Sequence, residues 1–273
     1  MTYLPALRGT ALIDAPARTV AAAVAEPWLL RQAVASVGVR LSGPDGQLAV
    51  GDVLVLRRFR WEVRLRVAAA DERGLLLTGG GARVSATVVP GDAGTLLTCA
   101  IGWTPPAALF GRLVARAVGR RWALRLLPKL LSGARRRAEQ LASAPVVVGA
   151  VVRDGKTVLA AQRARPPVLA GRWEFPGGRV EAGEDERAAL ARECREELTA
   201  DVVVGERLGP DLVLPNGWVL RLYLAELAPG AQPVAAEHRA IRWVSADEFA
   251  ELNWLDADRI VLPAVAETLA PQR

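Results

Sequence analysis

The chain has 273 residues, 51% of them hydrophobic and 23% charged, which is enough for two globular domains and excludes a disordered chain. No apolar run reaches the roughly 18 residues that a membrane-spanning helix needs, and the start of the sequence lacks the pattern of a signal peptide. Two isolated cysteines, Cys99 and Cys194, indicate neither a disulfide framework nor a metal cluster, so we expect a cytoplasmic protein.

The net charge of +6 combines two halves of opposite sign. Residues 1–144 hold 20 Lys and Arg against 9 Asp and Glu, a net of +11, whereas residues 145–273 hold 15 against 20, a net of −5. The change of sign favours two separately built domains and makes the overall basicity a poor indicator of nucleic-acid binding.

The first half predicts a strand at Gly9–Ile13 and then a helix, with Asp14 as its N-cap and Pro16 in its first turn. Five short strands punctuated by glycine follow, at Val50–Arg57, Trp61–Ala69, Gly74–Thr78, Arg83–Val89 and Gly94–Trp103. A long amphipathic helix is expected from about Pro106 to Ala142, kinked or divided by Pro128 and two glycines.

This order of a strand, helices, antiparallel strands and a long final helix resembles the START-like helix-grip superfamily (polyketide cyclase-like, SRPBCC). The segment ALIDAPARTVAAAVAEP looks like the opening of such a domain, and the resemblance covers about residues 7–142. It implies an antiparallel sheet wrapped on the C-terminal helix, often with a cavity for an apolar small molecule. We therefore expect a helix-grip domain at residues 1–143.

The expected boundary is Ser143-Ala144-Pro145, where a helix gives way to a strand, a turn and a second strand. The run VVVGAVV at residues 146–152 is β-branched, and the turn that follows contains Asp-Gly before TVLAAQR. We therefore expect a second domain at residues 144–273.

The segment 177–198, GGRVEAGEDERAALARECREEL, places many carboxylates behind a Pro-Gly-Gly turn. Apolar residues at helical spacing are expected to face a core: Leu190, Cys194 and Leu198. Three carboxylates at i, i+3 and i+4 share another side: Glu193, Glu196 and Glu197. Like charges so close destabilise a helix unless something offsets them, and Mg²⁺ prefers carboxylate oxygens. The pattern favours a cation site, with Arg192 aligning Glu196, over a solvated charged helix.

Residues Gly178 to Ala200 resemble the Nudix box, G-x5-E-x7-R-E-U-x-E-E-x-G-U, at every charged position. Thr199 stands where the box usually has glycine, a position that supports the helix exit and binds no metal. The segments GRWEFPGGRVEAGE and EHRAIRWVSADEFAELNWLDADRIV look like the MutT-type branch. The resemblance covers about residues 145–270 and implies a Nudix α/β/α sandwich with a mixed sheet, so the whole chain is expected to be a two-domain α+β protein.

The Nudix resemblance implies an enzyme that uses Mg²⁺, or Mn²⁺ in its place. The implied metal ligands are the carbonyl of Gly177 and the carboxylates of Glu193, Glu196, Glu197 and Glu237. The implied catalytic residues are Glu193, Glu237 and Arg192, and either glutamate can be the base. An exposed loop acid is the alternative for Glu237, and its neighbour His238 is expected to be solvated or hydrogen-bonded rather than a base.

The same resemblance implies substrate contacts from Arg163, Glu174, Phe175, Gly178 and Asp258. Arg163, in AAQRARP, would clamp phosphate oxygens, with a plain surface arginine as the alternative. Asp258, in WLDADRI, would read the base edge, with a helix N-cap as the alternative.

We therefore expect a nucleoside-triphosphate pyrophosphohydrolase with a ligand-binding domain fused in front. Candidate substrates are 8-oxo-dGTP and CTP or dCTP, including modified forms. The intact box glutamates argue against one alternative, a nucleotide or lipid sensor whose Nudix half binds without turnover. A second alternative is a nucleic-acid or acidic-membrane adaptor built on the arginine-rich first half. The sequence leaves the preferred base, the first domain's ligand and any coupling between domains open.

Overall fold

The computed structural model describes residues 7–104 and 109–270, and for residues 109–118 it describes the backbone alone. The chain divides into two compact units, Met1–Ser143 and Ala144–Arg273. The boundary between the units lies at the position where the sequence predicts a change from helix to strand. None of the described helices is both long and apolar enough to cross a membrane.

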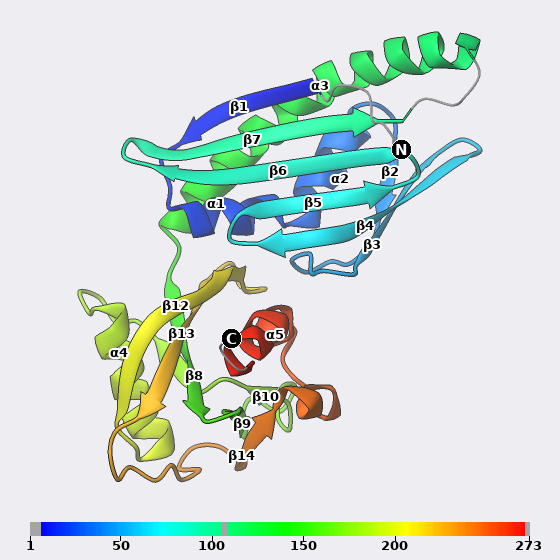
Figure 1. Cartoon of the computed structure of the whole chain (residues 1–273). Coiled ribbons are helices and arrows are strands. Elements are labelled where there is room, and N and C mark those ends of the chain that lie inside the picture. The colour runs from blue at the N-terminus through cyan, green and yellow to red at the C-terminus, as the bar shows by residue number, and fades with distance from the viewer. Residues whose placement is uncertain (1–6, 105–108, 271–273) are drawn as a thin grey trace. The chain divides into compact units, whose positions relative to one another are not determined.

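The N-terminal unit contains one antiparallel sheet of seven strands (Figure 1). Its strands are β1 (Leu7–Ile13), β2 (Arg40–Ser42), β3 (Val53–Arg58), β4 (Trp61–Asp71), β5 (Gly74–Gly79), β6 (Ala82–Gly91) and β7 (Gly94–Trp103). They lie in the order β1-β7-β6-β5-β4-β3-β2, so consecutive strands from β2 to β7 are neighbours and β1 closes onto β7. The six predicted strands are confirmed, although β3 begins at Val53 rather than Val50, and β2 is an additional strand.

Three helices complete this unit: α1 (Ala17–Val24), α2 (Pro27–Ala35) and α3 (Leu109–Ala142). Helix α3 packs against β1, β7, α1 and α2. Its described part buries one face at spacings of three and four residues, through Ala123, Leu127, Leu130, Ala134, Ala138 and Leu141. An ion pair of 2.6 Å between Arg137 and Glu26 joins α3 to the start of α2.

Two predictions about these helices need correction. Pro16 rather than Asp14 is the N-cap of α1, and no side chain caps that helix. Of the two alternatives for Pro128, a kink or a division of the helix, the division is wrong, because α3 continues through Pro128. Pro128 and Leu124, whose carbonyl loses its helical hydrogen bond, are both exposed, so water can satisfy that carbonyl. The predicted start at Pro106 and the side chains of residues 109–118 lie outside the described residues.

The C-terminal unit contains a second sheet, which is mixed as the sequence predicts. Its strands are β8 (Val146–Asp154), β9 (Thr157–Gln162), β10 (Trp173–Glu174), β11 (Gly177–Arg179), β12 (Val202–Val213), β13 (Val219–Leu227) and β14 (Ala240–Ser245). The main order is β10-β9-β8-β13-β12, with β11 on β8 and β14 on β9. Strands β8 and β13 run parallel, and the other pairs are antiparallel.

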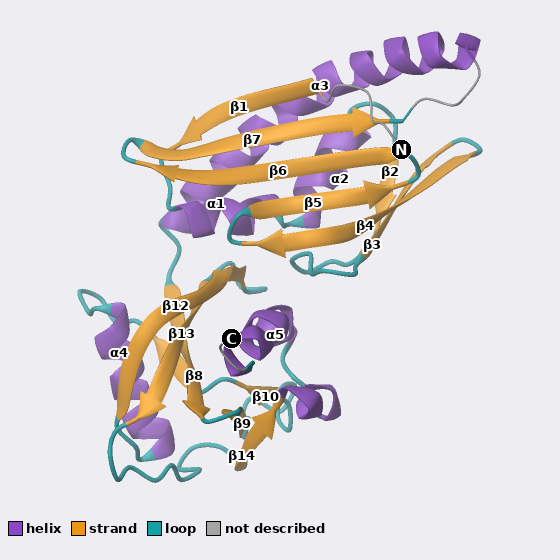
Figure 2. Ribbon diagram, in the orientation of Figure 1, coloured by secondary structure: helices purple, strands orange, loops and turns teal. Residues whose placement is uncertain are grey.

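Helices α4 (Glu186–Leu198) and α5 (Asp256–Leu269), with the 3₁₀ helix η1 (Ala246–Glu251), cover this sheet. Alternate residues of β8 face opposite sides. One side buries Val148 and Ala150 with α4, including the predicted core residues Leu190, Cys194 and Leu198. The other side buries Val151 with Val261 and Val265 of α5. The sheet therefore lies between the two helices, which gives three layers (Figure 2).

Candidate active site

Helix α4, which carries the box glutamates, is fixed at both ends. Asp185 is its N-cap, and its carboxylate accepts hydrogen bonds from the N–H groups of Arg187 at 2.9 Å and Ala188 at 3.3 Å. Thr199 follows the helix in the left-handed region, with φ 51° and ψ 31°. A glycine adopts this conformation without strain, so the departure from the box at Thr199 affects the helix exit, as the sequence predicts.

The glycine turn lies directly against α4. The N–H of Gly177 donates a hydrogen bond of 2.9 Å to the carboxylate of Glu197. A Cβ at position 178 would lie 2.2 Å from the carboxylate of Glu193, so only glycine leaves room there. Both glycines also pair with β8, opposite Gly149 and Val148. The sheet thus holds the turn in place over the two carboxylates.

Arg192 is the centre of a carboxylate cluster. It makes two hydrogen bonds to Glu184, at 3.0 and 3.1 Å, and further ones to Glu193 at 2.9 Å and Glu196 at 3.4 Å. The bonds to Glu184 and then Glu193 raise the pKa of Arg192 above its ordinary value. The predicted contact with Glu196 is confirmed. Glu184 is a site residue that was not predicted, although the spacing of the box, which includes a glutamate at this position, is the signal that could have identified it.

Glu197 is largely buried and lies near both His238 and two other carboxylates. Burial is the main cause that raises its pKa, and the charges of Glu174 and Glu193 raise it further. His238 and the N–H of Gly177 oppose this shift. The raised pKa of Glu197 therefore comes from burial, because His238 and the N–H of Gly177 each lower it by more than either neighbouring carboxylate raises it.

A second cluster of ionisable side chains, formed by Arg163, Glu174 and His238, lies near Glu197. Arg163, just after β9, forms an ion pair with Glu174 of β10. The Nε2 of His238 lies 3.4 Å from the other carboxylate oxygen of Glu174. The His238 side chain is only 4% exposed, so it is a hydrogen-bonded neighbour and not a solvated one. Burial lowers the pKa of His238, but the bond to Glu174 and the charges of Glu197 and Glu174 raise it overall.

Glu196 and Glu237 are the implied ligands that stay exposed. Glu237 lies in the loop before β14, and this loop contacts the end of α4 because the N–H of Ala236 donates to the carbonyl of Glu197 at 3.0 Å. Among the described residues, none forms a hydrogen bond or an ion pair with the Glu237 side chain. The structure thus brings the backbone of this loop to the end of α4 and leaves the Glu237 carboxylate exposed.

Phe175 and Asp258 lie in the core of the C-terminal unit. Phe175 is 4% exposed and packs on Trp254, with ring centroids 5.1 Å apart. Its N–H donates to Asp258 at 3.2 Å. Asp258 is 3% exposed, and burial raises its pKa to about 7. The N-cap alternative for Asp258 is wrong, because Leu255 holds that position and Asp258 lies inside the first turn of α5.

The implied metal ligands are of the type that divalent cations prefer, but their side chains are not arranged around one common point. Among the described residues, no three His, Cys, Asp or Glu side chains are gathered to hold a metal ion as they stand. Arg192 holds Glu193, and the N–H of Gly177 holds Glu197. The carboxylates are nevertheless close enough for Glu193 to raise the pKa of Glu197. Hard cations such as Mg²⁺ prefer such oxygens, so reorientation of these side chains would suit one.

Comparisons with known proteins identify the family of the C-terminal half of the chain. Residues 144–265 match the model of the NUDIX domain. A putative 8-oxo-dGTP diphosphatase 2 of Mycobacterium tuberculosis is 54% identical over 127 residues, which cover 45% of this chain and 89% of that protein. A CTP pyrophosphohydrolase of Escherichia coli is 38% identical over 120 residues, 44% of this chain and 88% of that protein. The solution structure of the E. coli ORF135 protein is 34% identical, with a TM-score of 0.41, and covers 46% of this chain and 91% of that one. Through its C-terminal half, the chain belongs to the NUDIX family.

Proposed function

We propose that residues 144–273 hydrolyse nucleoside triphosphates to the monophosphate and pyrophosphate, with Mg²⁺ as cofactor. The chain is a Nudix-type hydrolase acting on acid anhydrides, because it belongs to the NUDIX family and its relatives are named diphosphatases and pyrophosphohydrolases. The observation that carries the proposal is the contact of the glycine turn with Glu193 and Glu197. It holds two box carboxylates side by side, where phosphate oxygens and a cation would meet.

Transfer of a phosphoryl group depends on positioning and charge neutralisation more than on covalent help from the protein. Bound Mg²⁺ would polarise the phosphate and favour ionisation of water. Glu193, Glu196, Glu197 and Glu237, with the Gly177 carbonyl, would hold it. Arg192 would keep Glu193 oriented. Glu237 suits the role of base better than Glu193, because Arg192 already engages Glu193.

The names of the relatives support two substrate classes. The M. tuberculosis protein named an 8-oxo-dGTP diphosphatase has the higher identity, 54%, and the E. coli protein named a CTP pyrophosphohydrolase has 38%. We therefore rank 8-oxo-dGTP first, ahead of CTP and dCTP. Arg163 now forms an ion pair with Glu174. When substrate binds, Arg163 would leave Glu174 and contact the phosphate oxygens instead.

We further propose that the N-terminal unit is a START-like helix-grip domain that binds an apolar small molecule. The antiparallel sheet, with the long α3 packed against it, supports this proposal. So does a cavity of about 850 Å³ lined by residues of the sheet, α2 and α3. Pockets of this size hold small organic ligands.

A panel of nucleoside triphosphates with Mg²⁺, scored for pyrophosphate against orthophosphate, tests the enzymatic proposal. We expect pyrophosphate from 8-oxo-dGTP or CTP, and its loss in Glu197→Gln, which removes a carboxylate without changing shape. Glu206→Gln is the matched control, because Glu206 is exposed and outside the box. Release of orthophosphate, or full activity of Glu197→Gln, contradicts the proposal. Nucleotide binding without turnover across the panel would support the sensor alternative.

A further inference from the structure

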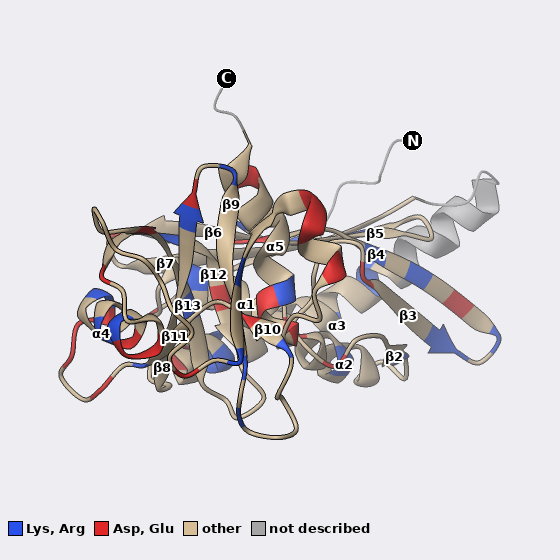
Figure 3. Ribbon diagram, turned by 90° about the horizontal axis from the view of Figure 1, so that it is seen from below, with Lys and Arg blue, Asp and Glu red and all other residues tan. Residues whose placement is uncertain are grey.

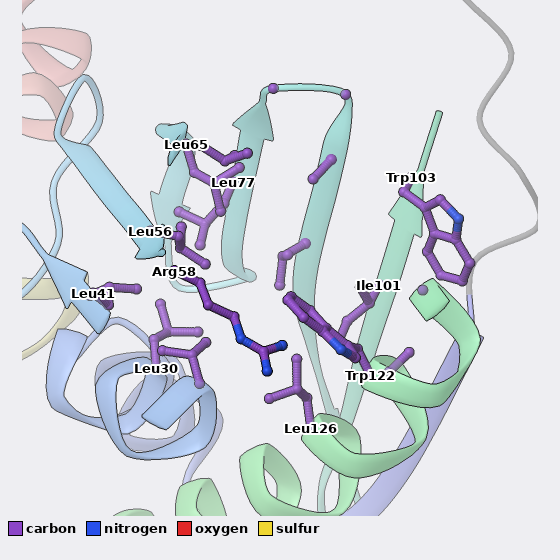
Figure 4. Close-up of a pocket in the computed structure, with 18 of the residues that line it drawn as sticks. Leu30, Leu41, Leu56, Arg58, Leu65, Leu77, Ile101, Trp103, Trp122 and Leu126 are labelled. Atoms are coloured by element: carbon purple, nitrogen blue, oxygen red, sulfur yellow. The ribbon is translucent and has the colours of Figure 1, made fainter. Parts of the chain in front are cut away.

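The cavity of the N-terminal unit is apolar over most of its surface. Its lining includes Leu30, Leu41, Leu56, Leu65, Leu77 and Leu126, which come from both the sheet and the helices (Figure 4). Such a lining stabilises the apolar body of a ligand by removing it from water. It does not by itself select one chemical class of ligand.

Two charged side chains break this pattern, the half-buried Arg58 and the exposed Arg60. Arg58, the last residue of β3, points into the cavity toward Trp122 (Figure 4). Its guanidinium carbon lies 5.5 Å from the Trp122 ring centroid and 5.6 Å from that of Phe59. Among the described residues, no carboxylate forms an ion pair or hydrogen bond with Arg58. Cation–π contacts offset only part of the cost of a half-buried cation, so Arg58 lacks the anion that such a position favours.

The surroundings of Arg58 are also positive. Arg40, Arg57 and Arg58 line an adjoining depression of about 580 Å³, and no acidic side chain is among the described residues that line it or the main cavity. Figure 3 shows the β3–β4 hairpin with several basic positions in blue. Glu62 pairs with Arg57 rather than Arg58. The site thus combines an apolar interior with one positively charged side.

We infer that the cavity binds an amphipathic acid, a small molecule with an apolar body and one anionic group, and that Arg58 pairs with the anion. The inference deepens the ligand-binding role proposed for the N-terminal unit and rests on it. A guanidinium binds a carboxylate through two parallel hydrogen bonds. The neighbouring leucines accommodate the apolar body, so both halves of the ligand have a complementary surface.

Three probes of similar length separate the head group from the body: decanoate, decan-1-ol and decyltrimethylammonium. Their affinity for the full chain is measured by displacement of the neutral dye Nile red, after direct titration of the dye. We expect decanoate to bind at least about tenfold more tightly than the alcohol, because a charged hydrogen-bonded pair is added. The cationic probe should bind most weakly.

Arg58→Leu should abolish the preference for decanoate while the alcohol binds as well as before or better. Arg66→Gln is the matched control, because Arg66 is an exposed arginine of β4 whose side chain alternates away from the cavity-lining Leu65. Nile red binding shows that the variant cavity is folded, and Arg58→Gln is the second variant if Arg58→Leu fails to fold. Equal affinity for acid and alcohol, or an unchanged preference in Arg58→Leu, overturns the inference while the ligand-binding role stands. If neither dye nor alcohol binds the parent chain, the ligand-binding role fails as well.

Discussion

Gly178 and the carboxylate of Glu193 are in direct contact, so that a Cβ at position 178 would lie 2.2 Å from both Cδ and Oε2 of Glu193. On its other side the same carboxylate accepts a hydrogen bond of 2.9 Å from Arg192. Gly178 is not among the residues with positive φ, so its backbone does not require glycine. The need for glycine comes from the space that the carboxylate occupies.

Gly178→Ala is therefore expected to reduce activity more than stability. The Glu193 side chain can move away from a methyl group at little cost, but its carboxylate then leaves its position. Misplacement by about 1 Å can cost on the order of 100-fold in rate. Turnover and thermal unfolding of the two proteins are the measurements. Gly46→Ala is the control, because no atom would lie within 4 Å of its Cβ, and a Gly178→Ala enzyme as active as this control would contradict the argument.

Thr199→Gly is expected to stabilise the C-terminal unit. A non-glycine residue in the left-handed region costs about 1–2 kcal/mol, and Thr199 adopts this region at φ 51°. Glycine relieves the strain, although its greater freedom in the unfolded chain removes part of the gain. Urea unfolding measures the difference. Thr199→Ala keeps a Cβ and therefore the strain, so equal midpoints for the Gly and Ala variants would rule out the explanation.

Asp258→Asn is expected to change how stability depends on pH. Burial raises the pKa of Asp258 from its ordinary 3.8 to about 7, so the folded state binds a proton that the unfolded state has lost. The contribution of Asp258 to the free energy of unfolding is thus greatest below about pH 4, and it decreases as the pH rises to about 7. Asparagine does not titrate and still accepts from Phe175, so the variant should lack this decrease.

Unfolding free energies of parent and variant at several pH values between 4 and 8 provide the test. Parallel curves for the two proteins would show that Asp258 does not titrate in this range. The same variant tests base recognition, because a residue that reads the base changes the ranking among nucleotides by about tenfold or more. We expect a uniform effect on all nucleotides, since Asp258 is 3% exposed and engaged by Phe175.

The sequence predicts α4 well because the contacts of this helix depend on residues close together in the chain. The i, i+4, i+8 spacing of Leu190, Cys194 and Leu198 is enough to set the buried face of α4. The spacing of Arg192 and Glu196 likewise sets their contact. These relationships need only helical geometry, which a pattern of residues determines directly.

Contacts that depend on loops or on docking were not predictable in this way. Arg192 bonds to Glu184 because the turn before α4 folds back toward the helix. The conformation of such a turn does not follow from a regular spacing of residues. Phe175 and Asp258 are 83 positions apart, so their hydrogen bond depends on how α5 packs against the sheet. The sequence suggested base recognition or an N-cap for Asp258, whereas packing placed its side chain in the core.

Residues 144–273 are expected to fold alone and to keep pyrophosphohydrolase activity. They form one compact unit with cores on both faces of their own sheet, and the NUDIX match lies at residues 144–265. A unit with its own core generally folds independently, so kcat should stay within about threefold of that of the full chain. Circular dichroism and pyrophosphate release measure the two properties, and the fragment with Glu197→Gln is the inactive control. A folded fragment without activity, beside an active full chain, would mean that residues 1–143 complete the active site.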